Sequence, residues 1–309
     1  MKEGKKFSAP VRVYWDLADG PEGGLGASKS IAVACELAGS KVFFAALRLA
    51  SGPMPGLGDI ISALKGGGAR VTVSVCDPGS FPSKDVIARA DVLDLCPKDA
   101  AGLSGLLKVA EMEEAGREKI SVSVVPTSDG GRQVEEIFGM AANSGIRLFS
   151  LPNPDLVNLG GPASRFVLDE GQRALCKKAV EGVLRPLGET ARLFVHDLFL
   201  HKALDLPGLA GHIEYAGCQA GDAIAYIDKT GLVYPCRSMP FSVGDLKHAS
   251  FRDIWSGEER NAVRARIMAV PDGCAGCAEK AVCKGGCRGL AFVEAGPGGR
   301  DPCCPGARG

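Results

Sequence analysis

The sequence has no long apolar run, few aromatic residues and no excess of either charge. Among its 309 residues, aromatic side chains make up 6%, and 36 Lys and Arg residues balance 36 Asp and Glu residues. A net charge of zero removes the basic surface on which nucleic-acid binders and proteins held on anionic lipid depend. No run approaches the roughly 18 apolar residues that a membrane-spanning helix needs. We therefore expect neither nucleic acid nor a membrane as a partner.

The N-terminal residues Met1–Pro10 also lack the features of a secretion signal. They are basic, but they contain no apolar core and no small-residue cleavage site. We therefore expect a cytoplasmic protein, in which thiols stay reduced. The chain contains 12 cysteines, and in that compartment closely spaced cysteines predict metal or cluster ligands before disulfides.

Short apolar stretches alternate with helical stretches over the first two thirds of the chain. Strands are predicted at Val11–Leu17, Lys41–Leu47, Arg70–Val75, Asp91–Leu95, Lys119–Val125, Arg147–Leu151 and Arg192–Leu200. Helices are predicted at Ala27–Ala38, Leu57–Lys65, Leu103–Glu114 and Gln133–Ala142. Such alternation predicts an α/β fold with a parallel sheet, because each parallel pairing needs a crossover that a helix fills. The pattern favours an open or partial barrel, with a doubly wound sheet as the alternative.

The pattern changes after Leu200, and Gly, Pro and Cys dominate from Leu206 to Gly309. Within this region Ser250–Met268 is amphipathic and is expected to be helical, its arginines forming a solvated face: Arg260, Arg264 and Arg266. So few apolar residues cannot form an independent core, which indicates that something inorganic holds the segment. We predict two domains, residues 1–205 and 206–309.

Eight of the twelve cysteines lie between Cys218 and Cys304. The strongest pattern is a CX2CX5CX3C run formed by Cys274, Cys277, Cys283 and Cys287, with Cys218 and Cys236 upstream and Cys303 and Cys304 downstream. Thiolates are soft ligands that select zinc, copper or iron–sulfur clusters, and the interspersed glycines permit tight turns. Seven or eight thiols are too many for one tetrahedral centre and fit two four-ligand centres. Spacing alone leaves zinc as the alternative to iron–sulfur.

These motifs resemble the seven-cysteine SPASM domain, the C-terminal extension of many radical SAM enzymes that modify peptides and proteins. The resemblance covers roughly Leu200 to Cys304. It includes the order Cys218-X12-Gly231-X4-Cys236 before the CX2CX5CX3C run, and the segments Phe251-Arg-Asp-Ile-Trp255 and Gly285-Gly-Cys287-Arg-Gly. The resemblance implies a degenerate radical-SAM-like partial (β/α)6 barrel, followed by a small irregular cysteine-rich SPASM domain.

The resemblance also implies two auxiliary [4Fe–4S] clusters and their ligands. The first cluster would take Cys218, Cys236 and Cys287. The second would take Cys274, Cys277, Cys283 and a tail cysteine, for which we choose Cys304 and keep Cys303 as the alternative. The first cluster then lacks a fourth cysteine. His212 stands where some relatives place one, so it is either the fourth ligand or a hydrogen-bonded neighbour of an open iron.

The N-terminal region departs from radical SAM enzymes at two places. In that family a CX3CX2C loop after the first strand binds the catalytic cluster, but residues 18–26 contain no cysteine. The family's second signature, a Gly-Gly-Glu-Pro-like segment, is replaced by Ser51-Gly-Pro-Met-Pro55. We therefore do not expect S-adenosylmethionine as a cofactor. Cys35, Cys76, Cys96 and Cys176 are dispersed and are interpreted as ordinary free thiols.

Two further patterns favour structural interpretations. Gly23–Ser30 comes close to a phosphate-binding loop but has Ser28 in place of the second glycine, and it is interpreted as a flexible loop before an N-capped helix. His196 and His201 lie on opposite faces of the last predicted strand, so they are not expected to share a metal.

Taken with the resemblance, the sequence predicts an accessory protein rather than an independent enzyme. It is similar to the SPASM-only component of GeoRSP-type systems, which contain a complete radical SAM/SPASM enzyme and a small peptide chaperone. The expected role is electron relay or substrate presentation in the modification of a ribosomally made peptide. The alternative is a non-redox peptide-binding scaffold with structural zinc or cluster centres.

Overall fold

The structure is a computed structural model that describes residues 8–19, 24–52, 54–129, 131–204, 206 and 217–306. Its contacts divide the chain into two units. The first joins Met1–Leu93 to Gln219–Ile267, and the second joins Asp94–Cys218 to Met268–Gly309. Each unit therefore combines part of the barrel-like region with part of the cysteine-rich region. The domain boundary that the sequence predicts between residues 205 and 206 stays a prediction.

The described strands of the first unit have the order β10-β9-β8-β1-β2-β3. Parallel pairing joins β1 to β2 and to β8, and β2 to β3, whereas β8, β9 and β10 pair antiparallel. The bounds are β1 Arg12–Ala18, β2 Phe44–Ser51, β3 Arg70–Val75, β8 Ile224–Ile227, β9 Leu232–Tyr234 and β10 Gly244–Asp245. Residues after Cys218 thus extend the sheet that the N-terminal strands begin.

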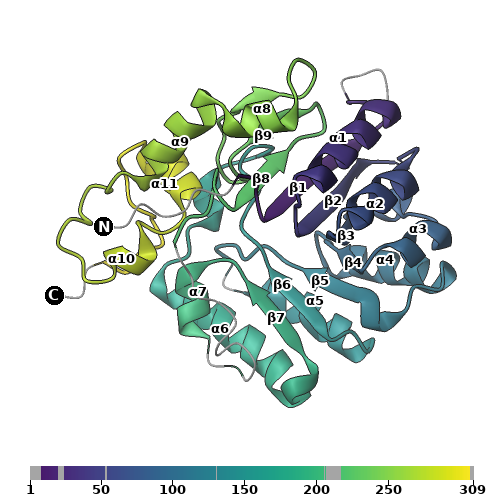
Figure 1. The fold of residues 1–309 in the computed structure, drawn as a ribbon. Helices are drawn as coiled ribbons and strands as arrows, with labels where there is room; N and C mark the ends of the chain where they lie inside the picture. The colour runs from purple at the N-terminus through teal and green to yellow at the C-terminus, as the bar shows by residue number, and fades with distance from the viewer. Residues whose placement is uncertain are drawn as a thin grey trace. The chain divides into compact units, whose positions relative to one another are not determined.

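Helices cover one face of this sheet (Figure 1). Val13, Trp15 and Leu17 alternate along β1 and are buried, because successive strand residues point to opposite faces. Tyr14 and Asp16 therefore face away from these helices. The helices of this unit are α1 Ala27–Gly39, α2 Leu57–Gly66, α3 Lys84–Arg89, α8 Phe251–Ser256 and most of α9 Glu258–Met268.

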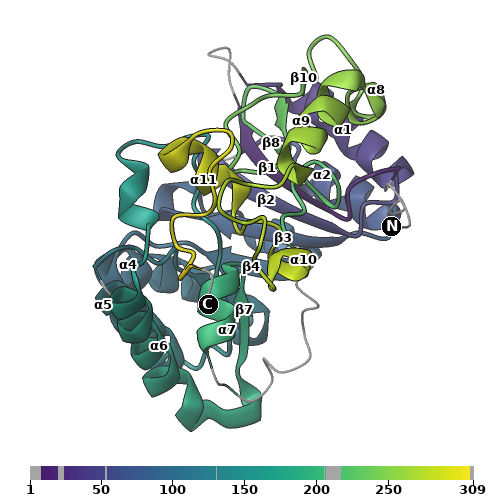
Figure 2. The same cartoon turned by 90° about the vertical axis from the view of Figure 1, so that its left-hand side faces the viewer.

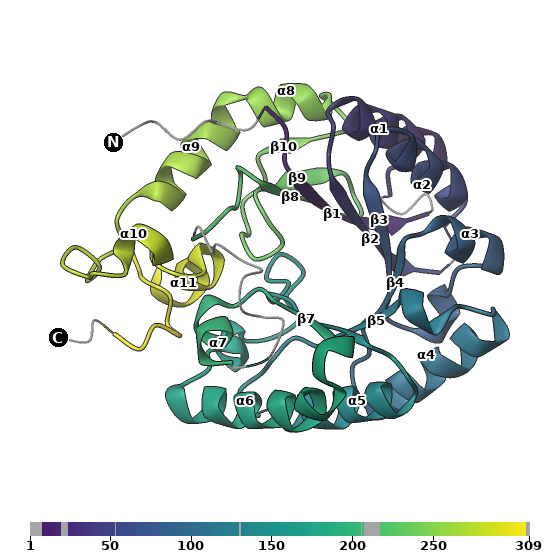
Figure 3. The same ribbon diagram turned by 60° about the horizontal axis from the view of Figure 1, so that its bottom comes forward.

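The second unit has its own parallel strands, in the order β5-β6-β7. Their bounds are β5 Ile120–Ser123, β6 Leu148–Leu151 and β7 Arg192–Val195, while β4 Val92–Leu95 lies at the division between the units. Helices α5 Arg132–Asn143 and α6 Glu170–Leu184 lie side by side (Figure 3). Only glycine fits at Gly131, because its φ is +88° and a Cβ there would lie 2.6 Å from Cα of Cys176. The other helices are α4 Ala100–Met112, α7 Leu198–Ala203, α10 Lys280–Cys283 and α11 Arg288–Ala295.

The predicted strand–helix alternation is confirmed, with some corrections. The second predicted strand is β2, but it begins at Phe44 and runs to Ser51. The last predicted strand stops at Val195, because Asp197 caps a helix: its side chain accepts a hydrogen bond from the N–H of Leu200. His196 therefore follows β7, whereas His201 lies in α7, so the two do not share a strand. Helix α6 was not predicted, although Asp169 and Gln172 form a capping box at its start.

The amphipathic stretch is also corrected. It forms two helices, α8 and α9, with Gly257 between them. Arg260 is buried, with its Nε donating to the carbonyl of Trp255 at 2.6 Å, and the Nη1 of Arg264 donates to the carbonyl of Ala220 at 3.0 Å. These two arginines therefore anchor α9 to the sheet region of the first unit, and only Arg266 is exposed as predicted.

Candidate metal centre

Cys283 ends helix α10 and Cys287 precedes helix α11, and Figure 2 shows the two short helices that this turn joins. The backbone N–H of Cys277 donates to the carbonyl of Cys274 at 3.2 Å, which closes a tight Cys-X2-Cys turn. Burial raises the pKa of Cys274, and the neighbouring Cys304 and Cys277 raise it further. The pKa of Cys283 is raised by burial and also by Cys304. Cys304 thus interacts electrostatically with both Cys274 and Cys283, and Cys277 interacts with Cys274. We call Cys274, Cys277, Cys283 and Cys304 the thiol group.

The turn from Cys283 to Cys287 has an unusual backbone. Lys284, Gly285 and Gly286 have φ values of 52°, 88° and 73°, so three successive residues are left-handed. The N–H of Gly286 donates to the carbonyl of Cys283 at 3.0 Å. The N–H groups of Gly285 and Gly286 also act on the Cys283 thiol and lower its pKa, against the larger effect of burial. Successive N–H groups that converge in this way form a concave site that favours a negatively charged atom. The turn therefore places N–H groups where they favour the thiolate form of Cys283, which is the form that binds metal.

Steric crowding is a second reason why only glycine fits at Gly285 and Gly286. A Cβ at Gly285 would lie 2.4 Å from Pro271 Cγ, and one at Gly286 would lie 2.5 Å from Cβ of Asp301. The close approach lets the turn and the chain around Asp301 pack directly against each other. The double glycine is thus a structural requirement of the cysteine group.

Asp301 connects the turn to the tail cysteines. Its carboxylate accepts hydrogen bonds from the N–H of Cys287 at 2.6 Å and from the N–H of Cys303 at 2.8 Å, and its carbonyl accepts from the N–H of Cys304 at 3.0 Å. The side chain is buried, and this burial raises the pKa of Asp301 to about 7, with Asp197 contributing. Asp301 therefore fixes three cysteine backbones at once.

The two tail cysteines have different environments. The sulfur of Cys303 accepts a hydrogen bond from the N–H of Leu168 at 3.3 Å and lies in an apolar cluster with Leu156 and Leu290. Burial raises the pKa of Cys303 to about 12. Cys304, by contrast, neighbours Cys274 and Cys283. The structure thus places Cys304 with the predicted ligands and Cys303 in the core.

The predicted ligands of the first cluster are divided between the units. Cys287 precedes α11, and Cys218 follows Gly217, where an added Cβ would lie 2.8 Å from the Lys284 side chain. Both therefore lie beside the same turn in the second unit. Cys236 belongs to the first unit, between β9 and β10. His212 lies outside the described residues.

The described chain offers thiol groups but no preformed site for a single ion. Over the described ranges, no three His, Cys, Asp or Glu side chains form a group that could hold one metal ion. No disulfide joins any of the twelve cysteines, all of which lie in the described ranges. The converging N–H groups, the thiols and the glycine cradle at Gly285 and Gly286 fit an iron–sulfur cluster bound by cysteines.

The loop after β1 has a different character. Leu25 packs against Gly231, whose φ is +95° and where an added Cβ would lie 2.5 Å from Cδ2 of Leu25. Helix α1 then begins at Ala27 with Gly26 as its N-cap and without a side-chain capping bond, which corrects the expected capping. Ser30 is buried in this helix. The sequence near-match to a phosphate loop therefore includes an apolar contact, and residues 20–23 lie outside the described ranges.

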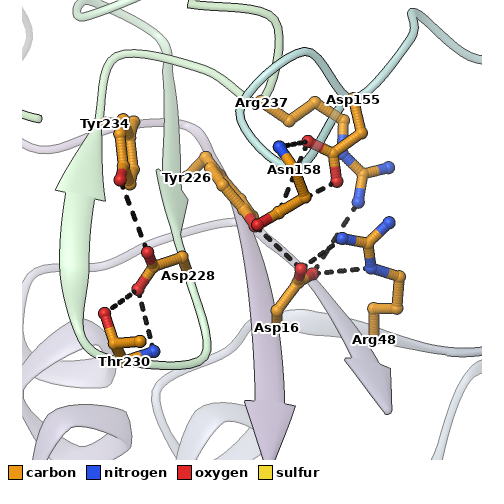
Figure 4. A network of polar contacts seen from close by, with 9 residues as sticks. All are labelled: Asp16, Arg48, Asp155, Asn158, Tyr226, Asp228, Thr230, Tyr234 and Arg237. Carbon is orange, nitrogen blue, oxygen red and sulfur yellow. Dashed lines mark hydrogen bonds and ion pairs between the residues drawn. The ribbon is translucent and has the colours of Figure 1, made fainter. Parts of the chain in front are cut away.

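A polar network surrounds Asp16 on β1, and Figure 4 shows its side chains. Asp16 is buried on β1, and its carboxylate accepts hydrogen bonds from Arg48 Nε at 2.8 Å and from the Tyr226 hydroxyl at 2.7 Å. A second contact with Arg48 makes the pair bidentate. Arg237, which follows Cys236, lies 3.8 Å from the same carboxylate and over the Tyr14 ring. Sequence reasoning missed this network, although a single acid in an apolar strand was a usable signal.

The dispersed cysteines remain apart from the group. Cys35 is exposed on α1, and Cys176 is buried in α6, where burial raises its pKa to about 12. Cys96 donates to the Asp94 carboxylate at 3.1 Å. Cys76 directly follows β3.

Residues 218–278 match the family model of the SPASM domain, an iron–sulfur cluster-binding domain. The matched segment begins at Cys218 and includes Cys236, Cys274 and Cys277. The match indicates iron–sulfur binding by this part of the chain.

Two curated proteins are similar over short stretches. The AdoMet-dependent heme synthase of Methanosarcina barkeri is 30% identical over 80 residues, which are 26% of this chain and 23% of the synthase. The pre-heme d1 synthase of Dinoroseobacter shibae is 32% identical over 107 residues, 33% of this chain and 26% of that enzyme. The matched part thus spans about a quarter of each relative's length.

Solved structures match almost the whole chain. Streptococcus suis SuiB bound to S-adenosylmethionine has a TM-score of 0.67 at 16% identity, covering 96% of this chain and 78% of SuiB. SuiB bound to the precursor peptide SuiA has a TM-score of 0.65 at 13% identity, covering 96% and 76%. Native anSMEcpe with bound AdoMet has a TM-score of 0.61 at 13% identity, covering 95% and 94%.

These matches show the fold. The predicted class, an α/β parallel-sheet domain of the radical SAM type with a C-terminal SPASM domain, is confirmed. No helix in the described ranges is long and apolar enough to span a membrane.

Proposed function

We propose that this protein is an iron–sulfur accessory protein that acts with a radical SAM enzyme in the modification of a ribosomally made peptide. The carrying observation is a contrast within the chain. In the thiol group, Cys304 interacts electrostatically with both Cys274 and Cys283, whereas residues 18–26, which follow the first strand, contain no cysteine. The similar fold of SuiB, solved with its precursor peptide SuiA, supports a peptide substrate.

The proposed ligands follow the two sets that the resemblance to the SPASM domain implies. Cys274, Cys277, Cys283 and Cys304 hold one [4Fe–4S] cluster, and their grouping in the second unit supports this set. Cys218, Cys236 and Cys287 hold the other. A [4Fe–4S] cluster bound to either set supplies one-electron transfer at a potential that its surroundings determine.

The residues of the chain contribute binding and insulation. The N–H groups of Gly285 and Gly286 stabilise the thiolate of Cys283, and Asp301 fixes the cysteine backbones on both sides of the group. Apolar packing around Cys303 keeps water from that side. The accessory protein thus either relays an electron to or from the partner enzyme or presents the peptide to it.

The same proposal leaves S-adenosylmethionine cleavage to the partner. Three cysteines on the loop after the first strand hold the catalytic cluster in radical SAM enzymes, and this loop has none. In the described part of the loop, Leu25 packs on Gly231 instead. This apolar contact supports the proposal that the loop does not bind a catalytic cluster in this protein.

The first test is the content of iron, acid-labile sulfide and zinc per chain after strictly anaerobic isolation. Two four-iron clusters predict about eight iron and eight sulfide. Zinc without sulfide would contradict the iron–sulfur assignment and would leave the alternative, a peptide-binding scaffold with structural zinc.

The second test measures the role. A radical SAM/SPASM enzyme from the same organism is incubated with its precursor peptide, S-adenosylmethionine and a reductant, with and without this protein. The relay role predicts that peptide modification requires this protein and fails with its Cys283→Ser variant. Modification that persists with a folded, cluster-deficient variant favours peptide presentation. Equal S-adenosylmethionine cleavage and equal peptide product without the protein would overturn both roles.

A further inference from the structure

We propose that Asn153 is a positioning residue that raises the reduction potential of the cluster bound by Cys287. Its Nδ2 lies 3.7 Å from the Cys287 sulfur, within hydrogen-bonding distance of a sulfur acceptor. Asn153 comes from the segment after β6, 134 residues away from Cys287 in sequence. The inference rests on the proposed function, because it needs a cluster on Cys287.

The backbone around Asn153 holds the amide in place. Pro152 and Pro154 flank it, and each proline ring fixes its own φ near −65°. A residue that precedes proline is itself restricted to extended conformations. The chain therefore loses little further freedom when Asn153 donates its hydrogen bond.

The acceptor is held equally well. The N–H of Cys287 donates to the Asp301 carboxylate at 2.6 Å. The Cys287 side chain packs against an apolar cluster that contains Leu156, three residues after Asn153, and Leu290, three residues after Cys287. One apolar cluster thus sets the separation of donor and acceptor.

A hydrogen bond to a ligand sulfur changes the redox equilibrium of the cluster. Reduction adds negative charge that is shared with the thiolate sulfurs, so an N–H donor stabilises the reduced form more than the oxidised form. Hydrogen bonds to the sulfurs are among the factors that set cluster potentials. Asn153 and Cys287 are both partly buried, which strengthens this electrostatic effect. Loss of the donor should shift the midpoint potential to a more negative value.

The test replaces Asn153 with a side chain of similar size that has no donor, Asn153→Leu. The full-length protein, isolated anaerobically, is titrated with dithionite and mediators while electron paramagnetic resonance follows each cluster. We expect one midpoint potential to become more negative, the other to stay unchanged, and the iron and sulfide contents to equal those of the wild type. The matched control is Asn158→Leu, because the Asn158 amide donates to Asp155 at 3.2 Å; it should leave both potentials unchanged.

A second readout identifies the proton itself. The reduced wild-type protein is exchanged into D2O and measured by pulsed electron paramagnetic resonance. The deuteron of the Asn153 amide should then give a coupling to the cluster that is absent from Asn153→Leu. If the Leu variant loses iron, Asn153→Met is measured instead. Its side chain is neutral and has no donor, so it should shift the potential in the same direction without adding a charge.

The outcomes separate this inference from the function on which it rests. Unchanged potentials in a fully loaded variant, or an unchanged deuteron coupling, would overturn the role of Asn153 and leave the clusters intact. A wild-type protein without iron and sulfide would overturn the proposed function, and the inference with it.

Discussion

The thiol group of the second unit and the polar network of the first unit solve opposite problems with buried polar atoms. In the second unit, the N–H groups of Gly285 and Gly286 lower the pKa of Cys283 against the effect of burial and so favour the thiolate that binds metal. In the first unit, the Asp16 carboxylate is already occupied by Arg48 and Tyr226. A site that holds a cofactor must keep ligand capacity in reserve, whereas a structural network uses all of it. Burial of polar atoms alone therefore does not identify a cofactor site.

The two units can be followed separately by experiment. The chain contains two tryptophans, Trp15 and Trp255, and both are buried in the first unit. Tryptophan fluorescence therefore reports on the first unit. Iron content and cluster absorbance report on the cysteines.

The largest effect is expected from the tail cysteines. Cys304→Ser should lose about half of the iron and sulfide, because one four-iron centre loses a ligand. Cys303→Ser should keep the metal but lower stability by roughly 1–3 kcal/mol, because it places a hydroxyl in an apolar cluster. Metal analysis and the urea midpoint check both, with exposed Cys35→Ser as the control. If only the Cys303 variant loses iron, Cys303 is the cluster ligand and Cys304 is not.

The next largest effect concerns the double-glycine turn. Gly286→Ala combines a left-handed backbone, which costs roughly 1–3 kcal/mol, with overpacking against Asp301, which costs a similar amount. We expect a loss of about 2–5 kcal/mol in stability together with reduced cluster content. Gly276→Ala is the matched control, because a Cβ there meets nothing within 4 Å. Equal behaviour of the two variants would contradict the packing of the turn on Asp301.

The next prediction concerns the polar network around Asp16 in the first unit. Asp16→Ala leaves two arginines without their shared carboxylate, and breaking a buried pair in this way costs about 3–5 kcal/mol. Arg48 keeps 23% of its side chain exposed, so water screens part of this loss and we expect roughly 2–4 kcal/mol. Tryptophan fluorescence during urea unfolding measures it. Iron bound to Cys274, Cys277 and Cys283 should be unaffected, and its loss would show that the two regions depend on each other.

Local pattern predicted most of the elements, because strands and helices bury residues with different periods. It failed where a single residue overrides the pattern. Asp197 ends a strand-like run by capping α7. Helix α6 was missed because much of its surface is polar, although the capping box at its start can be recognised in the sequence.

The candidate site shows where such prediction ends. Spacing predicted a set of cysteine ligands, since turn geometry is local, and this set stays a prediction. It could not separate Cys303 from Cys304, because the Leu168 amide that holds Cys303 lies 135 residues away in sequence. The Asp16 network is more distant still, because Tyr226 is 210 residues from Asp16. An acid in an apolar strand signals that a partner exists, but the local sequence does not say which distant residue that partner is.

The smallest expected effect is a pH-dependent one in the first unit. The Asp91 carboxylate accepts hydrogen bonds from Lys65 Nζ and from the N–H of Val71, each at 2.8 Å. Burial alone would raise the pKa of Asp91, but these bonds and the charges of Lys65 and Arg70 outweigh it and lower the pKa. Asp91 therefore stabilises the fold above its unfolded pKa of about 3.9, and this contribution is lost as the pH falls through the lower folded value.

Asp91→Asn should cost about 0.5–1 kcal/mol at neutral pH, because the side chain is partly exposed. The difference from the wild type should shrink as the pH falls below about 4, since the wild-type carboxyl then becomes protonated as well. Urea midpoints from tryptophan fluorescence at several pH values measure it. Lys65→Met removes the ammonium but keeps the Val71 bond, so it should show a smaller loss with the same pH trend. A difference that stays constant from neutral to acid pH would mean that hydrogen-bond shape, and not charge, makes Asp91 stabilising.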